Sequence, residues 1–112
     1  MLNETDVKEF VLESVAAAMV ELGQAPGPLH GDLFDDQTGA SPGRIASFEL
    51  DKHGKLTWWN WRSEDACGRA DFPLKLKIEF AEDERRTVWL RGNSHGRGRS
   101  WDIEDHRRTT QV

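Results

Sequence analysis

The stretch "LKLKIEF" (residues 74–80) is the clearest strand pattern in the chain and sets the fold. Leucine, isoleucine and phenylalanine occupy every second position, and charged residues stand between them. Because successive side chains of a strand point to opposite faces of a sheet, the alternation predicts one apolar and one charged face. We therefore expect a sheet that is covered by another element on its apolar face.

Similar segments lie on both sides of this stretch. "RIASFEL" (44–50) and "KLTWWNW" (55–61) flank the turn "DKHG", which predicts a hairpin. "TVWLRG" (87–92) follows the polar turn "AEDERR", and "SWDIEDH" (100–106) is a candidate fifth strand. Since consecutive strands joined by short turns usually pair as neighbours, we predict an antiparallel meander of four to five strands.

One amphipathic helix is predicted ahead of the sheet, over residues 6–22. Its apolar residues recur with helical spacing, and Asn3 or Thr5 offers an N-cap while Gly23 offers a stop. Residues 23–43 hold five glycines and three prolines, which predicts a long irregular connection. The expected architecture is a single α+β domain over 1–112, with the sheet at 44–106 and a frayed tail at 107–112.

Composition narrows the class of protein. The 112 residues carry a net charge of −5, and residues 1–56 hold ten Asp/Glu against four Lys/Arg. This acidity argues against nucleic acid as a partner, because such binding depends on neutralising phosphates. A single cysteine, a polar start and the lack of a long apolar run favour a cytoplasmic protein without a membrane segment.

Alternation also assigns the tryptophans of "KLTWWNW" to faces. If Leu56 and Trp58 join the helix-facing core, Trp59 and Trp61 point to the opposite face. The same face is expected to hold Lys75, Lys77, Trp89 and Arg91, and the loop "RGNSHGRGRS" adds Arg97 and Arg99 at its rim.

Three interpretations of this Trp/Arg-rich face stand together. Tryptophan and arginine are enriched at binding hot spots, which favours a partner-binding surface. A ladder of aromatic rings and lysine stems that only stabilises the sheet is the first alternative. The second is an additional core covered by the long connection at 23–43.

Two other groups of residues could carry chemistry. "LHGDLFDD" holds His30, Asp32, Asp35 and Asp36, a weak candidate for a divalent metal, since the spacing fits no established calcium loop and equally suits a solvated turn. Cys67, with His95, Asp102 and His106 further along, lacks any cysteine-nucleophile signature. No cofactor and no catalytic residue are predicted.

The sequence thus favours a small non-enzymatic protein that binds another protein and blocks or modulates it, in the manner of inhibitor or immunity proteins. A homodimer formed through the same outer sheet face is compatible with this hypothesis. The alternatives are a single-stranded nucleic-acid or small anionic ligand binder that uses the same aromatic residues and, less favoured, a metal-dependent hydrolase at "HGDLFDD".

Overall fold

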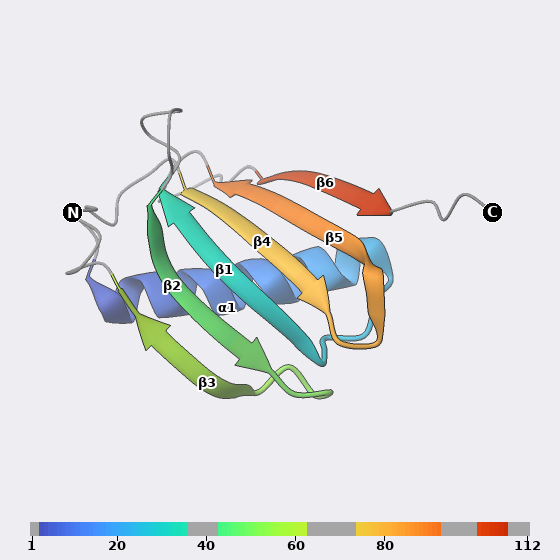
Figure 1. Ribbon diagram of the computed structural model, residues 1–112, viewed down its shortest axis with the longest axis horizontal. Helices are drawn as coiled ribbons and strands as arrows, with labels where there is room; N and C mark the ends of the chain where they lie inside the picture. Colours follow the sequence, from blue (N-terminus) through green and yellow to red (C-terminus); the bar gives the residue numbers. More distant parts are fainter. Residues whose placement is uncertain (1–2, 36–42, 63–73, 93–100, 108–112) are drawn as a thin grey trace.

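The computed structural model describes residues 3–35, 43–62, 74–92 and 101–107. One helix packs against a six-stranded antiparallel sheet (Figure 1), which confirms the α+β class and adds at least one strand to the expected four or five. The elements in chain order are α1 (Glu4–Leu22), β1 (Leu29–Asp35), β2 (Arg44–Leu50), β3 (Leu56–Trp61), β4 (Leu74–Phe80), β5 (Asp83–Gly92) and β6 (Trp101–Arg107).

The ends of α1 follow the capping signals in the sequence. The Asn3 side chain accepts a hydrogen bond of 2.8 Å from the backbone N–H of Asp6, which satisfies one donor of the first turn. Gly23 takes the left-handed conformation with φ 64°, and its N–H caps the last carbonyls. Between these ends the helix buries one stripe against the sheet, made by Val7, Phe10, Val11, Ser14, Val15, Ala18 and Met19.

The strand order β3-β2-β1-β4-β5-β6 differs from a simple meander. Strands β1 to β3 form one meander and β4 to β6 form another, and the two are joined by antiparallel pairing of β1 with β4. The chain therefore passes from the edge strand β3 back to the centre before β4 begins (Figure 1). The expected pairing of neighbours holds within each half and fails at the β3–β4 connection.

The central strand β1 corrects the prediction of an irregular connection over residues 23–43. Leu29 and Leu33 are buried, and His30 and Asp32 between them point the other way, so the segment does alternate. Its pattern is hidden by Gly31, which stands where an inward apolar side chain is expected. A Cβ at this position would collide with the Phe48 ring, so the glycine makes room for that ring.

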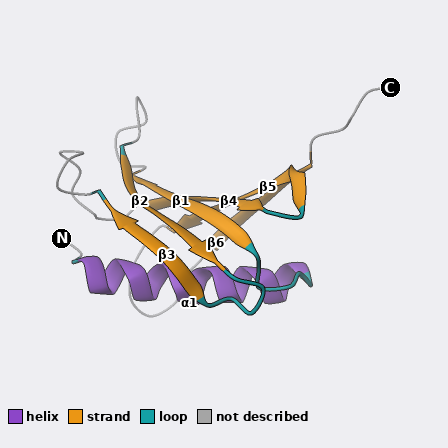
Figure 2. Ribbon diagram, turned by 60° about the horizontal axis from the view of Figure 1, so that its bottom comes forward, coloured by secondary structure: helices purple, strands orange, loops and turns teal. Residues whose placement is uncertain are grey.

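The core lies between α1 and one face of the sheet, and Figure 2 shows the helix running along that face. Nine of the sheet residues predicted to face the helix are buried, which confirms their assignment: Ala46, Phe48, Leu50, Leu74, Leu76, Ile78, Phe80, Val88 and Leu90. Of the two residues of β3 expected to join them, Leu56 is partly buried and Trp58 is 44% exposed. In the described part of the chain, no helix or strand covers the opposite face of the sheet, which we call the outer face.

Candidate binding face

The outer face is built by alternate residues of all six strands, brought into rows by the antiparallel registers. It mixes aromatic and charged side chains of both signs. Its members are Trp58 and Asn60; Arg44, Ser47 and Glu49; His30, Asp32 and Phe34; Lys75, Lys77 and Glu79; Thr87, Trp89 and Arg91; and Glu104 and His106.

The structure reverses the expected faces of the tryptophans in β3. Trp59 lies opposite Phe48 and Trp61 opposite Ala46, both helix-side positions, while Trp58 lies opposite the exposed Glu49. The cause is a register shift, because Leu50 pairs with Leu56 whereas Glu49 pairs with Trp58, which leaves one extra residue in β3. A one-residue shift inverts every side chain beyond it, so alternation counted from Leu56 gave the wrong face.

On the helix side, Trp59 and Trp61 extend the core at its edge. Their rings stack at 6.3 Å, and the Trp59 ring lies 6.1 Å from that of Phe48. The Trp59 indole N–H donates a hydrogen bond of 3.1 Å to Glu4 of α1, and the Lys8 Nζ lies 5.2 Å from the ring centroid. Trp59 therefore attaches β3 to the start of the helix, and Trp61 supports its ring.

Lys75, Lys77, Trp89 and Arg91 lie together on the outer face, where the sequence predicted them. The Lys75 Nζ lies 4.4 Å from the Trp89 ring centroid and the Lys77 Nζ 5.8 Å, both within reach of a cation–π contact. The Phe34 ring lies 6.3 Å away, and Arg91 follows two residues along β5. We call Phe34, Lys75, Lys77, Trp89 and Arg91 the Trp89 cluster.

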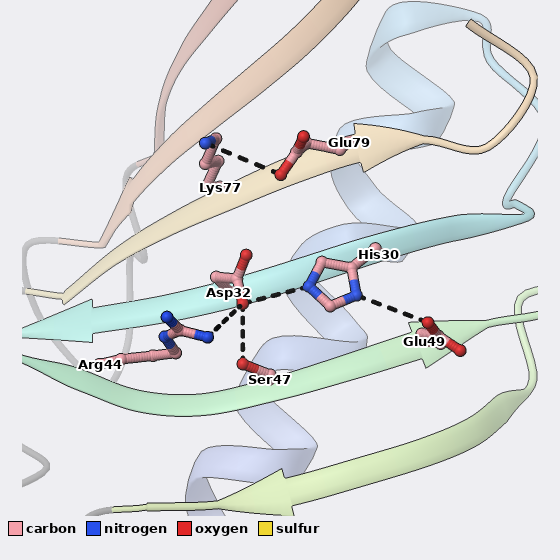
Figure 3. Close-up of polar contacts among 7 residues, drawn as sticks. All are labelled: His30, Asp32, Arg44, Ser47, Glu49, Lys77 and Glu79. Carbon is pink, nitrogen blue, oxygen red and sulfur yellow. Dashed lines mark hydrogen bonds and ion pairs between the residues drawn. The ribbon is translucent and has the colours of Figure 1, made fainter. Parts of the chain in front are cut away.

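A second group on the outer face surrounds Asp32 and was not foreseen as a unit (Figure 3). Asp32 Oδ1 accepts a hydrogen bond of 2.7 Å from Ser47 Oγ and lies 3.1 Å from His30 Nε2. Arg44 lies 3.8 Å from the same oxygen, and Glu49 lies 3.7 Å from His30 Nδ1 on the other side of the ring. The alternation in "LHGDLFD" places His30 and Asp32 on the same face as Ser47 and Glu49, whereas Arg44 joins that face through the register shift next to Phe34.

The Asp32 group contains a serine, a histidine and a carboxylate but lacks the geometry of a nucleophilic triad. Both Ser47 and His30 contact the carboxylate, whereas nucleophilic catalysis requires the base to contact the hydroxyl. Ser47 is also only 2% exposed, so its hydroxyl is not presented to a substrate. The arrangement is a polar network that satisfies a largely buried carboxylate at the centre of the sheet.

The metal hypothesis gains no support from the described residues. Among them, no three His, Cys, Asp or Glu side chains are arranged to hold an ion. His30, Asp32 and Asp35 lie in the strand β1 instead of a loop, and Asp36 lies outside the described residues. Arg97, Arg99, Cys67 and His95 also lie outside them, so the predicted arginine rim is not described.

A hollow of about 400 Å³ opens at the end of the outer face where β1 begins. Its lining combines the apolar residues Leu29, Leu50 and Phe80 with the acidic residues Glu49 and Glu79. Basic residues of the face stand at the opposite end of the strands, where Arg44, Lys75 and Arg91 lie in the row of Phe34. The outer face is therefore acidic at one end and basic at the other.

Comparison of the chain with protein-family models, curated proteins and solved structures found no match. Within the described ranges, no helix combines the length and the apolar character needed to cross a membrane.

Proposed function

We propose that this protein is a non-enzymatic binding module whose outer sheet face docks onto another protein and blocks or modulates it. The observation that supports the proposal is the Trp89 cluster, a tryptophan flanked by two lysines on a face that no described helix or strand covers. Tryptophan and arginine are over-represented among residues that dominate binding energy, because they offer large area with a polar group.

The position of the cluster suits a docking centre. Trp89 lies in β5 opposite Lys77 of β4, with β6 on its other side, so the ring stands inside the face and not at its border. Residues at the middle of an interface lose the most water on binding, while charged residues at the rim chiefly steer the encounter. The charged ends of the outer face, acidic at Glu49 and Glu79 and basic at Arg44, fit such a rim.

The alternative of a purely stabilising ladder uses the same contacts and predicts a different result. If the contacts only form a stabilising ladder, replacing Trp89 lowers the stability of the fold and there is no partner whose binding could be lost. If Trp89 is a docking centre, replacing it weakens the binding of a partner protein. We therefore expect Trp89→Ala to retain a cooperative unfolding transition and to abolish capture of the partner. The contacts of its ring with lysines on the same face are individually modest.

The experiment places a photo-crosslinking residue at Thr87, on the outer face two residues before Trp89, and exposes the protein to an extract of its native host. The matched control carries the same residue at Val20, which is 82% exposed on α1. We expect one discrete crosslinked protein from position 87, lost on Trp89→Ala, and none from position 20. A crosslinked protein obtained from position 20 alone contradicts the proposal, and so does one obtained from position 87 whose yield does not change in Trp89→Ala.

Single-stranded nucleic acid is the second candidate, favoured by the three basic residues around the Trp89 ring. Against it, Asp32, Glu79 and Glu104 share the face, and the whole chain carries a net charge of −5. Titration with oligonucleotides at low salt, followed by tryptophan fluorescence, separates the two. We expect no quench; a salt-sensitive quench that disappears in Trp89→Ala supports nucleic-acid binding.

A further inference from the structure

The edge strand β3 is unusually unprotected. It lies at one end of the strand order, and within the described residues it pairs only with β2. Its sequence, Leu56–Trp61, contains neither a charged residue nor proline. Natural sheets normally blunt an edge with lysine, proline or inward charges, because an open edge is a template for another strand.

The backbone groups available on this edge follow from the ladder with β2. The N–H of Arg62 donates to the Ile45 carbonyl at 2.7 Å, so residue 62 directs its backbone groups toward β2. Since these groups alternate along an antiparallel strand, residues 58 and 60 also face β2, whereas Trp59 and Trp61 face outward. Between residues 58 and 62, the edge that faces away from β2 therefore presents two N–H and two C=O groups, one of each from Trp59 and from Trp61.

The other edge of the sheet is built in the opposite way. Strand β6 carries Glu104, Asp105 and His106 side by side, and all three are exposed. A second β6 laid antiparallel on this strand with the two-fold axis at Glu104 or Asp105 would set two carboxylates face to face, which is destabilising. The uncharged β3 edge is therefore better suited than β6 to pair with a copy of itself.

We propose that two copies of this chain associate through β3, with the strands antiparallel and a two-fold axis at Asn60, to form a continuous twelve-stranded sheet. In this register, Trp59 of one copy pairs with Trp61 of the second, and the outward groups of both form about four backbone hydrogen bonds. The proposal is separate from the function proposed above, because the Trp89 cluster lies on β1, β4 and β5, away from this edge.

The side chains in this register are complementary on both faces. On the helix side, each Trp59 meets a Trp61 of the second copy, an aromatic cross-strand pair that occurs twice. On the outer side, Trp58, which is 44% exposed, meets the exposed Arg62 of the second copy, a cation–π pair that also occurs twice. Asn60 meets its own copy at the axis, and no like charges face one another.

The register is tested by a cysteine placed on the axis. Asn60→Cys in a Cys67→Ser background has one thiol, and its two copies form a non-hydrogen-bonded pair with Cα atoms about 4.5 Å apart. This separation lies within the range of disulfides, so mild oxidation should yield a covalent dimer. Thr57→Cys in the same background is the matched control, because its copies lie about 20 Å apart and should not crosslink.

A second test needs no crosslink. Sedimentation over a range of concentrations should show a monomer–dimer equilibrium for the unmodified chain, weakened roughly tenfold or more by Asn60→Lys, which sets two ammonium groups face to face at the axis. His106→Lys makes the same addition of charge on the β6 edge and should leave the equilibrium unchanged. Circular dichroism confirms that each variant is folded, and Arg62→Glu is a further exposed variant expected to weaken the dimer.

Three results overturn the proposal. One is a chain that stays monomeric at every concentration, which would leave the edge to a strand from another protein. The second is a dimer that is equally stable in Asn60→Lys and Arg62→Glu. The third is crosslinking of Thr57→Cys as readily as Asn60→Cys, which would show contact without this register. Loss of partner capture in Trp89→Ala alone leaves the dimer intact, so the two proposals fail separately.

Discussion

The two halves of the sheet are tied to opposite ends of the same helix by different chemistry. At the β3 edge the attachment is aromatic: Trp59 packs on Phe48, donates its indole N–H to Glu4 and lies under the Lys8 ammonium. The apolar area of the ring provides most of the stabilisation, because the hydrogen bond is exposed and therefore of small net value.

At the β6 edge the attachment is ionic. Arg86 of β5 donates to both carboxylate oxygens of Asp105 in β6, at 2.9 and 2.8 Å, and its third donor reaches Gln24 just beyond α1. The guanidinium carbon lies 5.2 Å from the Phe80 ring centroid, and the side chain is only 11% exposed. The hydrogen bond to Asp105 raises the pKa of Arg86 above its ordinary value, so the guanidinium stays charged at every pH at which the protein is folded.

The difference shows how each edge responds to change. Truncating an aromatic side chain lowers the free energy of unfolding roughly in proportion to the apolar area that is removed. Deleting one partner of an ion pair has a further cost, because the remaining charge is left without a partner. The same difference bears on the proposed association, since β3 carries no charged residue whereas β6 carries exposed acidic residues.

The largest expected effect is at the aromatic edge. Trp59→Ala removes a ring packed against the core and should lower the free energy of unfolding by about 3 kcal/mol. Trp58→Ala removes the same side chain one residue earlier, where it is 44% exposed and stacks on the His30 ring, and should cost less than about 1 kcal/mol. Urea unfolding of the two variants under identical conditions measures both values.

This pair also tests the inverted faces of β3. Alternation counted from Leu56 assigns Trp58 to the core and Trp59 to solvent, so it requires the opposite order of costs. Equal losses from the two substitutions would contradict the structure as well, because one indole is on the helix side and the other on the outer face.

Much of the fold could be predicted because its signals are local. The helix carries its own caps at Asn3 and Gly23, and Leu74–Phe80 alternates without interruption. Two features of the sheet could not be predicted from the sequence, for physical reasons. Gly31 replaces an apolar residue in β1 so that the Phe48 ring has room, a contact between strands that no local pattern records. The extra residue in β3 depends on its pairing with β2.

The candidate site was predictable only where alternation is unbroken. Lys75, Lys77, Trp89 and Arg91 were placed on the correct face, because β4 and β5 keep a regular register through them. The Asp32 group could not be foreseen, since it joins β1 to β2 through a segment expected to be irregular. Sequence reasoning therefore found the half of the face made by a simple hairpin.

The next effect in size is at the ionic edge. Arg86→Met keeps the aliphatic stem over Phe80 and removes the guanidinium, which leaves Asp105 without its bidentate partner. We expect a loss of about 2 kcal/mol in the free energy of unfolding, because the arginine is nearly buried although the carboxylate is partly exposed. Chemical denaturation at neutral pH measures it.

The control for the ionic edge is the neighbouring arginine. Arg85→Met makes the same change at an exposed position of β5 and should alter stability by less than about 0.5 kcal/mol. If the two variants lose the same amount, net charge and not the contact with Asp105 controls stability at this edge.

The smallest effect concerns the turn that positions β3. Asp51 Oδ1 accepts hydrogen bonds from the backbone N–H groups of His53 (2.8 Å) and Lys55 (2.9 Å), and Gly54 takes the φ of 80° that closes the turn. The hydrogen bond from Lys55, with that from His53 and the positive charges of both residues, holds the pKa of Asp51 below its ordinary value despite some loss of hydration.

A folded-state pKa below the unfolded one means that the carboxylate stabilises the fold at pH values above its unfolded pKa of about 3.9. This contribution is lost as the pH falls through the lower, folded value, where both states bind the proton. Asp51→Asn keeps an acceptor oxygen and removes the charge, so the variant should be slightly less stable than the parent at pH 7 and equal to it near pH 2. Urea midpoints measured between these limits should converge on acidification; a gap that stays constant would mean that the shape of the turn, and not the charge on Asp51, keeps β3 in register.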